Sequence, residues 1–155
     1  MLLVGAILVI LGSAMGLTNY LIDEQIPMKL LEFMRTIIGS KIVFLILLNI
    51  LLLIVGCMMD MFSAIIVVVP LIAPIAKEFG VNPIHLGIIF LANLEIGYFT
   101  PPVGLNLFIA SFRFNKSILK LYLSALPFLL IYLISLLIIT YVPELSLWLV
   151  RIFGD

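Results

Sequence analysis

The stretch NLEIGYFTPPVGLNLF, from Asn93 to Phe108, places polar residues and two consecutive prolines inside an otherwise apolar segment. Proline has no backbone N–H and its ring clashes with the preceding turn, so a helix through this stretch must break at Pro101 and Pro102. Inside a bilayer the backbone groups freed by the break need partners from protein, water or a bound ion, because lipid tails supply none. The stretch therefore predicts either a kink that a neighbouring helix repairs or a binding site.

The composition of the whole chain places this stretch in a membrane. Of the 155 residues, 65% are hydrophobic and 10% are charged, and the mean hydropathy is +1.41, whereas soluble domains are roughly half apolar and a quarter charged. The formal net charge is zero and no basic run occurs, which argues against a nucleic-acid partner because binding phosphates requires clustered Lys and Arg. The single cysteine, Cys57, is interpreted as a small buried hydrophobe.

The chain is expected to form a single transmembrane domain of the all-α polytopic class. Hydrophobic runs and turn residues divide it into five segments. We expect a scaffold span at 1–22, an interfacial arm helix at 24–38, a hairpin at 41–80, a broken (discontinuous) helix at 83–114 and a last span at 118–143. The first segment lacks a basic region ahead of its apolar run, so it is interpreted as a retained span or as an internal helix of a longer protein.

The hairpin at 41–80 is expected to be re-entrant rather than to span the membrane twice. Its second arm, from Ala64 to Ala76, is short and contains Pro70 and Pro74, whereas a full span needs about 20 apolar residues. Two full spans remain the alternative. In the re-entrant case the tip near Asp60 lies at membrane depth, which is tolerated only where protein or water surrounds it.

The broken helix is expected to run from Pro83 to about Tyr98 and to resume at about Leu105. Neither half is long enough to span alone, so together they make one discontinuous crossing, the element with which transporters hold ions and substrates near the midplane. The positive residues that follow, from Arg113 to Lys120, place that loop in the cytoplasm by the positive-inside rule.

Two acidic residues at membrane depth require an explanation, because a charge there costs about 2.5 to 3.5 kcal/mol on insertion scales. Asp60 is interpreted either as a cation ligand at the hairpin tip or as a cap of the second hairpin arm. Glu95 either attracts cations or pairs with a basic or hydroxyl group on a neighbouring helix. His85 is interpreted as a helix-start or interface residue near the surface rather than a proton relay.

At the break, freed carbonyls and the hydroxyl of Thr100 suit a hard cation such as sodium. We therefore predict Thr100 and Gly104 as sodium ligands. The complete set of candidate ion- or substrate-binding residues is Gly56, Asp60, Ser63, Asn93, Gly97, Thr100, Pro101, Pro102, Gly104 and Asn106. Asp60, His85 and Ser63 match no hydrolase motif, so we predict no catalytic residue and no enzyme.

A longer stretch, from Asn49 to Phe108, combines several of these features in a fixed order. A Gly and then an Asp in the hairpin are followed by the Pro70 and Pro74 pair, by the run GVNPIH, and by Gly-x-x-Thr-Pro-Pro-Val-Gly. In this order and spacing the sequence resembles the C-terminal half of the large permease subunit of tripartite ATP-independent periplasmic (TRAP) transporters. The similarity extends more loosely from Leu2 to the tail PELSLWL.

The resemblance implies two inverted repeats, each with a scaffold span, an arm helix, a re-entrant hairpin and a broken helix, of which this chain contains one set. It implies sodium symport of small organic anions, dicarboxylates or sugar acids, through the bacterial inner membrane by a multi-pass protein. Sodium is expected to be the coupling ion, and no cofactor is expected. The ion-binding region falls on Gly56–Ser63 and on the residues from Gly97 to Gly104.

The resemblance also implies three partners: a small membrane subunit, a periplasmic solute-binding protein and the missing N-terminal half of the large subunit. Two alternatives stay open at this point. One is a sodium-coupled anion symporter of related architecture that needs no binding protein. The other is a membrane module that does not transport, such as a truncated remnant.

Overall fold

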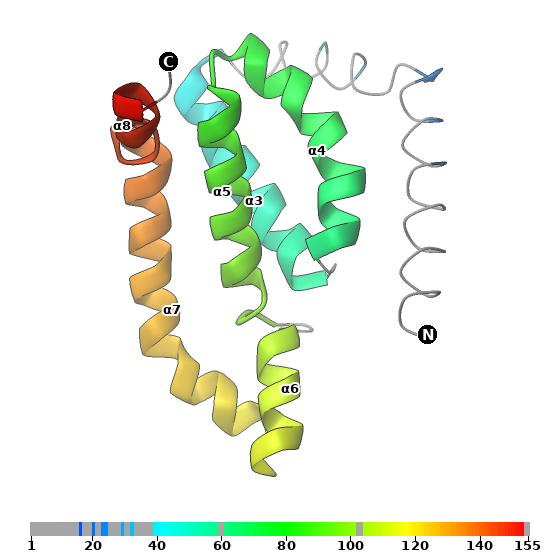
Figure 1. The fold of residues 1–155 in the computed structure, drawn as a ribbon. Helices are drawn as coiled ribbons and strands as arrows, with labels where there is room; N and C mark the ends of the chain where they lie inside the picture. Colours follow the sequence, from blue (N-terminus) through cyan, green and yellow to red (C-terminus); the bar gives the residue numbers. More distant parts are fainter. Residues whose placement is uncertain are drawn as a thin grey trace. The chain divides into compact units, whose positions relative to one another are not determined.

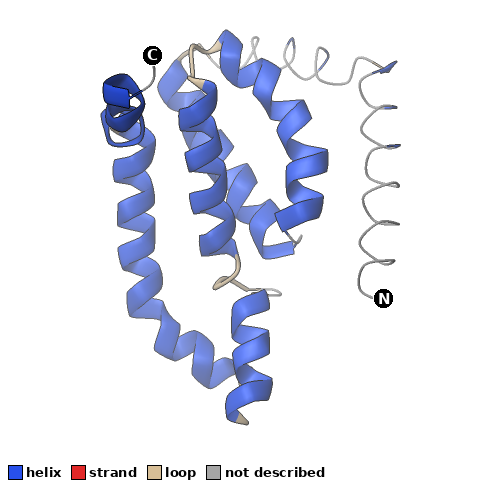
Figure 2. Cartoon of the chain, in the orientation of Figure 1, coloured by secondary structure: helices blue, strands red, loops and turns tan. Residues whose placement is uncertain are grey.

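The computed structural model describes residues 39–58, 61–101 and 104–153, together with the isolated residues 16, 20, 23, 24, 29 and 32. Every regular element in these ranges is an α-helix (Figure 2), which confirms the all-α fold class. The helices are α3 Lys41–Met58, α4 Met61–Glu78, α5 Pro83–Gly97, α6 Leu105–Phe114, α7 Ile118–Tyr141 and α8 Pro143–Phe153. The expected scaffold span at 1–22 and arm helix at 24–38 lie outside the described residues.

Three of the described helices, α3, α4 and α7, are long and apolar enough to cross a membrane by length and composition. The expectation that the second hairpin arm is short is wrong, because α4 has 18 residues, as α3 does, and continues through Pro70 and Pro74. Those prolines stand four residues apart, so the hydrogen bonds they remove lie on one face and the helix persists. The re-entrant path of the segment 41–80 stays a prediction.

The chain divides into two compact units, the first formed by Met1–Phe44 with Met59–Pro83 and the second by Leu45–Met58 with Ile84–Asp155. In the first unit, the start of α3 meets the turn that follows α4. Lys41 Nζ donates a hydrogen bond of 2.8 Å to the Gly80 carbonyl, and the rings of Phe44 and Phe79 stack with centroids 4.6 Å apart. The segment 41–80 therefore begins and ends at the same place.

Gly80 closes α4 with the hydrogen-bond pattern of a glycine C-cap. Its φ is +68°, a left-handed conformation that residues with a Cβ rarely adopt. Val81 N donates to Ala76 O at 2.9 Å and Gly80 N donates to Lys77 O at 3.0 Å, the two bonds of a Schellman motif. This cap reverses the chain and brings Gly80 within reach of Lys41.

In the second unit, α3 and α5 each bury one face, because apolar or small residues recur three and four positions apart. On α3 the buried residues in this unit are Leu45, Leu48, Asn49, Leu52 and Gly56. On α5 they are His85, Leu86, Ile89, Phe90, Asn93, Leu94, Ile96 and Gly97. From α7, Leu136 and Thr140 are buried. The opposite faces are apolar and exposed, as expected of helices that meet lipid.

The remaining elements of the second unit are α6, α7 and α8. In Figure 1, α7 bends in its first half, where Pro127 lies inside the helix, and α6 lies beside that half. A proline removes one helical bond and kinks the helix at its position. The last span, expected at 118–143, ends at Tyr141. A further helix that the sequence did not predict, α8, has 11 residues and starts at Pro143. Proline is a favoured first residue of a helix. In α8, Arg151 forms an exposed ion pair of 2.7 Å with Glu144.

Candidate functional site

The chain between α5 and α6 leaves the helical conformation around the predicted prolines, with α5 ending at Gly97 and α6 beginning at Leu105. Local bonds replace part of the lost helical ladder. Phe99 N donates to Ile96 O at 3.0 Å, and Thr100 N donates to Gly97 O at 2.9 Å. The Thr100 hydroxyl also donates to Ile96 O, at 2.8 Å. The break thus does not free every carbonyl before the prolines, because tight turns with i→i+3 bonds satisfy some of them.

The chain re-enters a helix through Gly104, which has φ 54° and ψ 66°. A Cβ at this position would lie 3.1 Å from the hydroxyl oxygen of Tyr122 and 3.2 Å from the carbonyl oxygen of Thr100. Asn106, half-buried in the first turn of α6, donates its backbone N–H to Tyr98 O at 3.2 Å. Glycine is needed here for its conformation and for the space it leaves between two oxygen atoms.

The last turns of α3 and α5 touch backbone to backbone. A Cβ on Gly97 would lie 2.6 Å from the Cα of Gly56 and 2.7 Å from the N of Cys57, and a Cβ on Gly56 would lie 2.9 Å from the Cα of Leu94. Neither position accepts a side chain unless the helices move apart. Because both helices end near this contact, their terminal carbonyl groups and the negative ends of their dipoles lie close together, which favours a cation.

Asn93 is buried one helical turn before this contact. Its side chain is fully enclosed, with 0% exposed, and its Nδ2 donates to Asn49 Oδ1 at 2.7 Å and to Ile89 O at 2.8 Å. Both amide hydrogens are therefore used inside the protein. Its Oδ1 has no hydrogen-bond partner within the described residues. An amide oxygen of this kind is a suitable ligand for a hard cation. If Asn93 binds an ion as predicted, this oxygen is the atom that would do so.

The sequence analysis missed two buried polar residues that connect to Asn93, namely Asn49 on α3 and Thr140 on α7. Asn49 Nδ2 donates to Thr140 Oγ1 at 3.1 Å, and the imidazole Nε2 of His85 lies 3.2 Å from Thr140 O. His85 is in the first turn of α5 as expected, but the expectation of a surface position is wrong because 3% of it is exposed. A polar residue inside an apolar run at helical spacing was the available signal for Asn49.

The other predicted residues belong to the first unit, are exposed, or lie outside the described residues. Ser63 is half-buried in the first turn of α4, in the first unit. Pro101 and Glu95 are exposed, and Glu95 forms no ion pair within the described part of the chain. Asp60 and Pro102 lie outside the described residues. The structure thus brings Gly56, Asn93 and Gly97 together, and Thr100 and Gly104 follow Gly97 closely in the sequence. The ligand roles of all ten residues stay predictions.

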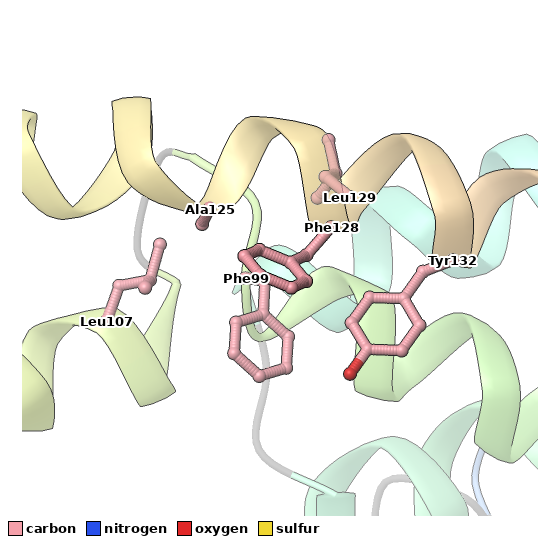
Figure 3. A pocket seen from close by; sticks show the side chains of 6 residues that line it. All are labelled: Phe99, Leu107, Ala125, Phe128, Leu129 and Tyr132. Carbon is pink, nitrogen blue, oxygen red and sulfur yellow. The ribbon is translucent and has the colours of Figure 1, made fainter.

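An apolar cavity of about 140 Å³ lies between the break and α7 (Figure 3). Phe99 enters it from the break and Leu107 from α6, and the ring of Phe99 stacks on Tyr132 with centroids 5.9 Å apart. The remaining lining residues, Ala125, Phe128 and Leu129, come from α7. A carbon-lined cavity offers an ion no ligand. The stacking of Phe99 on Tyr132 holds the break against α7.

Polar side chains of the kind that bind transition metals do not gather in the part of the chain described: no three His, Cys, Asp or Glu residues there are close enough to share a metal ion. The oxygens near the break are backbone carbonyls, one amide and two hydroxyls. Such neutral oxygens bind sodium or calcium rather than zinc or iron.

Comparison with known proteins gives a family match over most of the chain. Residues 1–145 match the family described as "Tripartite ATP-independent periplasmic transporter, DctM component". The chain is 43% identical over 138 residues to the C4-dicarboxylate TRAP transporter large permease protein DctM of Pseudomonas aeruginosa, a match that covers 89% of this chain and 32% of that protein.

Two further relatives have names that refer to other substrates. The isethionate TRAP transporter permease protein DctMQ of Oleidesulfovibrio alaskensis is 39% identical over 142 residues, which cover 92% of this chain and 22% of that protein. The sialic acid TRAP transporter large permease protein SiaM of Vibrio cholerae is 32% identical over 130 residues, which cover 84% of this chain and 30% of that protein.

The chain thus spans about a third or less of the length of these curated relatives. All three are named as permeases, that is, as components of transporters and not as enzymes. The family match extends over nearly the whole chain, and the apolar helices agree with it. This membrane protein belongs to the DctM family of large permease components of tripartite ATP-independent periplasmic transporters.

Proposed function

We propose that this chain forms part of a permease that imports small organic anions, such as dicarboxylates or sugar acids, through the bacterial inner membrane together with sodium. Membership of the DctM family supports transport. The names of three relatives refer to a C4-dicarboxylate, isethionate and sialic acid, which are all small molecules with an acidic group. The shared chemistry favours an organic anion as the substrate of this chain.

The observation that carries the proposal is the contact between Gly56 and Gly97 at the ends of α3 and α5. Two helix C-termini with close backbones form a region of negative potential next to an unwound segment. The Thr100 hydroxyl donates its hydrogen to Ile96 O and keeps its lone pairs for a cation. We assign the sodium ion to this region, with Thr100, Gly104 and the Oδ1 of Asn93 as ligands.

A complete site needs more than this chain. We propose that the chain contributes one of two inverted repeats and that an N-terminal half of the large subunit supplies the other. A small membrane subunit and a periplasmic solute-binding protein are the expected partners. The length of the relatives, of which the chain covers 32% or less, is consistent with a requirement for further segments.

Sodium-driven uptake in proteoliposomes tests the proposal. The intact permease that contains this chain is reconstituted with the small subunit and the binding protein, and uptake of a labelled dicarboxylate, sulfonate or sugar acid is measured with and without a sodium gradient. We expect Thr100→Ala and Asp60→Ala to lower sodium-driven uptake at least about tenfold each. Ser124→Ala is the matched control, because the hydroxyl of Ser124 donates to Lys120 O within α7.

Uptake that is unchanged by Thr100→Ala and Asp60→Ala would contradict the site assignment. Uptake without the binding protein would favour a symporter that works without it. A complete assembly that moves none of the three substrate classes would favour a membrane module without transport activity.

A further inference from the structure

Three helices of the second unit are joined by buried polar side chains. Asn93 on α5 donates to Asn49 on α3 at 2.7 Å, and Asn49 donates to Thr140 on α7 at 3.1 Å. The exposed fractions of these residues are 0%, 6% and 1%, so water does not compete for the bonds. Each residue lies on an otherwise apolar buried face of its helix.

His85 adds a fourth contact, to the main chain of α7. The carbonyl of Thr140 belongs to the last turn of α7, which ends at Tyr141, and carbonyls of a last turn have no partner within their own helix. The imidazole Nε2 lies 3.2 Å from this oxygen and donates to it as N–H, because a carbonyl only accepts. The first turn of α5 thereby holds the end of α7.

These polar contacts lie on the same helix faces as the glycine contact. Asn93 precedes Gly97 by one helical turn, and Asn49 precedes Gly56 by about two turns. The glycines let the two backbones approach, but a smooth contact without side chains does not prevent one helix from sliding along the other. A slip of one turn, about 5.4 Å, would break every bond between Asn49 and Asn93.

We propose that Asn49, Asn93 and Thr140, together with His85, form a polar clasp that fixes the register of α3, α5 and α7 and thereby sets the depth of the helix break. Asn49 and Thr140 are positioning residues, because they act through the contact of Gly56 with Gly97 and not by touching the ion. The effect on transport rests on the proposed function, whereas the effect on register does not.

The native Cys57 reports the register directly. Its backbone N lies at the contact with Gly97, 2.7 Å from the Cβ position of that glycine, and its side chain is half-buried. We expect Thr140→Val, which removes the hydroxyl and keeps the shape, to raise the maleimide labelling rate of Cys57 about threefold, the equivalent of one interhelical bond of about 0.6 kcal/mol. Thr140→Ser keeps the hydroxyl and is expected to label as the wild type does.

Labelling is measured in native membrane vesicles on the permease as expressed, and is assigned to Cys57 by peptide mass spectrometry, with Cys57→Ser as the blank. Ser135→Ala is the matched control on α7, because the hydroxyl of the half-buried Ser135 donates to Ile131 O of its own helix at 2.9 Å. A wild-type labelling rate in both Thr140→Val and Asn49→Leu would overturn the proposal.

A triple variant separates register from stability. In Asn49→Leu/Asn93→Leu/Thr140→Val all three partners are apolar and of similar size, and such a replacement is close to neutral for folding. We expect its melting temperature in detergent to stay within about 4 °C of the wild type, while Cys57 labelling remains raised about threefold. If the triple variant has a melting temperature close to that of the wild type and also a wild-type labelling rate of Cys57, the polar contacts do not fix the register and the proposal is refuted.

Transport supplies a second readout. We expect Thr140→Val to raise the sodium concentration for half-maximal uptake about threefold, with recovery in Thr140→Ser. A raised labelling rate with unchanged sodium dependence would keep the clasp as a register device and refute its link to the ion. If the wild type shows no sodium-dependent uptake, the proposed function fails while the labelling result still decides the clasp.

Discussion

Two pairs of prolines in this chain have opposite effects on a helix. In α4, Pro70 and Pro74 lie inside one continuous helix of 18 residues. Between α5 and α6, the adjacent Pro101 and Pro102 coincide with an interruption from Gly97 to Leu105. The helices α4 and α5 are similarly apolar, so the hydrophobicity of the helix before the break does not explain the difference.

Spacing explains it. A proline disfavours the α conformation of the residue before it, and adjacent prolines impose this restriction on two consecutive residues, Thr100 and Pro101. Prolines four residues apart remove bonds on one face and leave the residues between them free to stay helical. A glycine in the left-handed conformation, Gly104, then completes the interruption and has no counterpart within α4. A proline pair in a membrane helix therefore predicts an interruption of the helix when the prolines are adjacent.

The strongest test of this comparison is to make the broken helix continuous. Pro101→Ala/Pro102→Ala restores two backbone N–H donors and removes the restriction on Thr100. We expect helical content by circular dichroism to rise and sodium-driven uptake to fall by about a hundredfold, because the unwound segment is the proposed ion site. Pro70→Ala/Pro74→Ala is the control and is expected to keep uptake within about twofold. Comparable losses in both variants would remove the distinction.

A second test concerns the glycine at the end of α5. We expect Gly97→Ala to lower the free energy of unfolding by about 1 to 3 kcal/mol, since its Cβ would overlap the backbone of Gly56. Gly87→Ala lies in the same helix with nothing within 4 Å of its Cβ position, and is expected to raise the free energy of unfolding by about 0.5 to 1 kcal/mol. Thermal unfolding in detergent measures both; equal effects would argue against the close contact.

A third test separates backbone conformation from crowding. Gly104 and Gly80 both have positive φ, 54° and 68°. Gly80 has nothing within 4 Å of its Cβ position, while Gly104 faces the hydroxyl of Tyr122 at 3.1 Å. We expect Gly80→Ala to lower the free energy of unfolding by about 1 kcal/mol and Gly104→Ala to lower it by about 2 kcal/mol. Adding Tyr122→Phe to Gly104→Ala should recover part of the difference, and no recovery would exclude crowding by the hydroxyl.

The smallest effects are expected when a hydrogen bond from a side-chain hydroxyl to the carbonyl four residues earlier is removed in two different settings. Thr100 donates to Ile96 O at 2.8 Å at the break, and Ser124 donates to Lys120 O at 2.9 Å inside α7. We expect Thr100→Val to lower the free energy of unfolding by about 0.5 to 1.5 kcal/mol, because the carbonyl loses part of its satisfaction. Ser124→Ala should be neutral or stabilising by a few tenths of a kcal/mol, since alanine favours helix and the ladder there is complete.

Local rules gave the parts of the fold that depend on neighbouring residues. Adjacent prolines and Gly104 are visible in the sequence, and they predict where α5 stops and α6 starts. The contact of Gly56 with Gly97 joins residues 41 positions apart in the sequence, and the bond of Asn49 with Thr140 spans 91 positions. No local pattern carries such pairings, because they depend on how the helices pack.

The two wrong expectations have the same origin. The second hairpin arm was expected to be short because each proline was counted as a helix breaker, although tertiary packing and proline spacing let α4 continue. His85 was placed at the surface because it begins a helix, although the end of α7 covers it and accepts its hydrogen bond. A polar residue inside an apolar helix face marks Asn49 and Asn93 individually, but it does not show that they bond to each other or to Thr140.

The meeting of Lys41 with Gly80 has a consequence for how the protein is made. A segment whose first and last residues lie together requires neither flank to be carried across the bilayer during synthesis. The sequences before and after residues 41–80 can therefore stay on the side where they began. The stacked rings of Phe44 and Phe79 help to hold the two ends of the segment together.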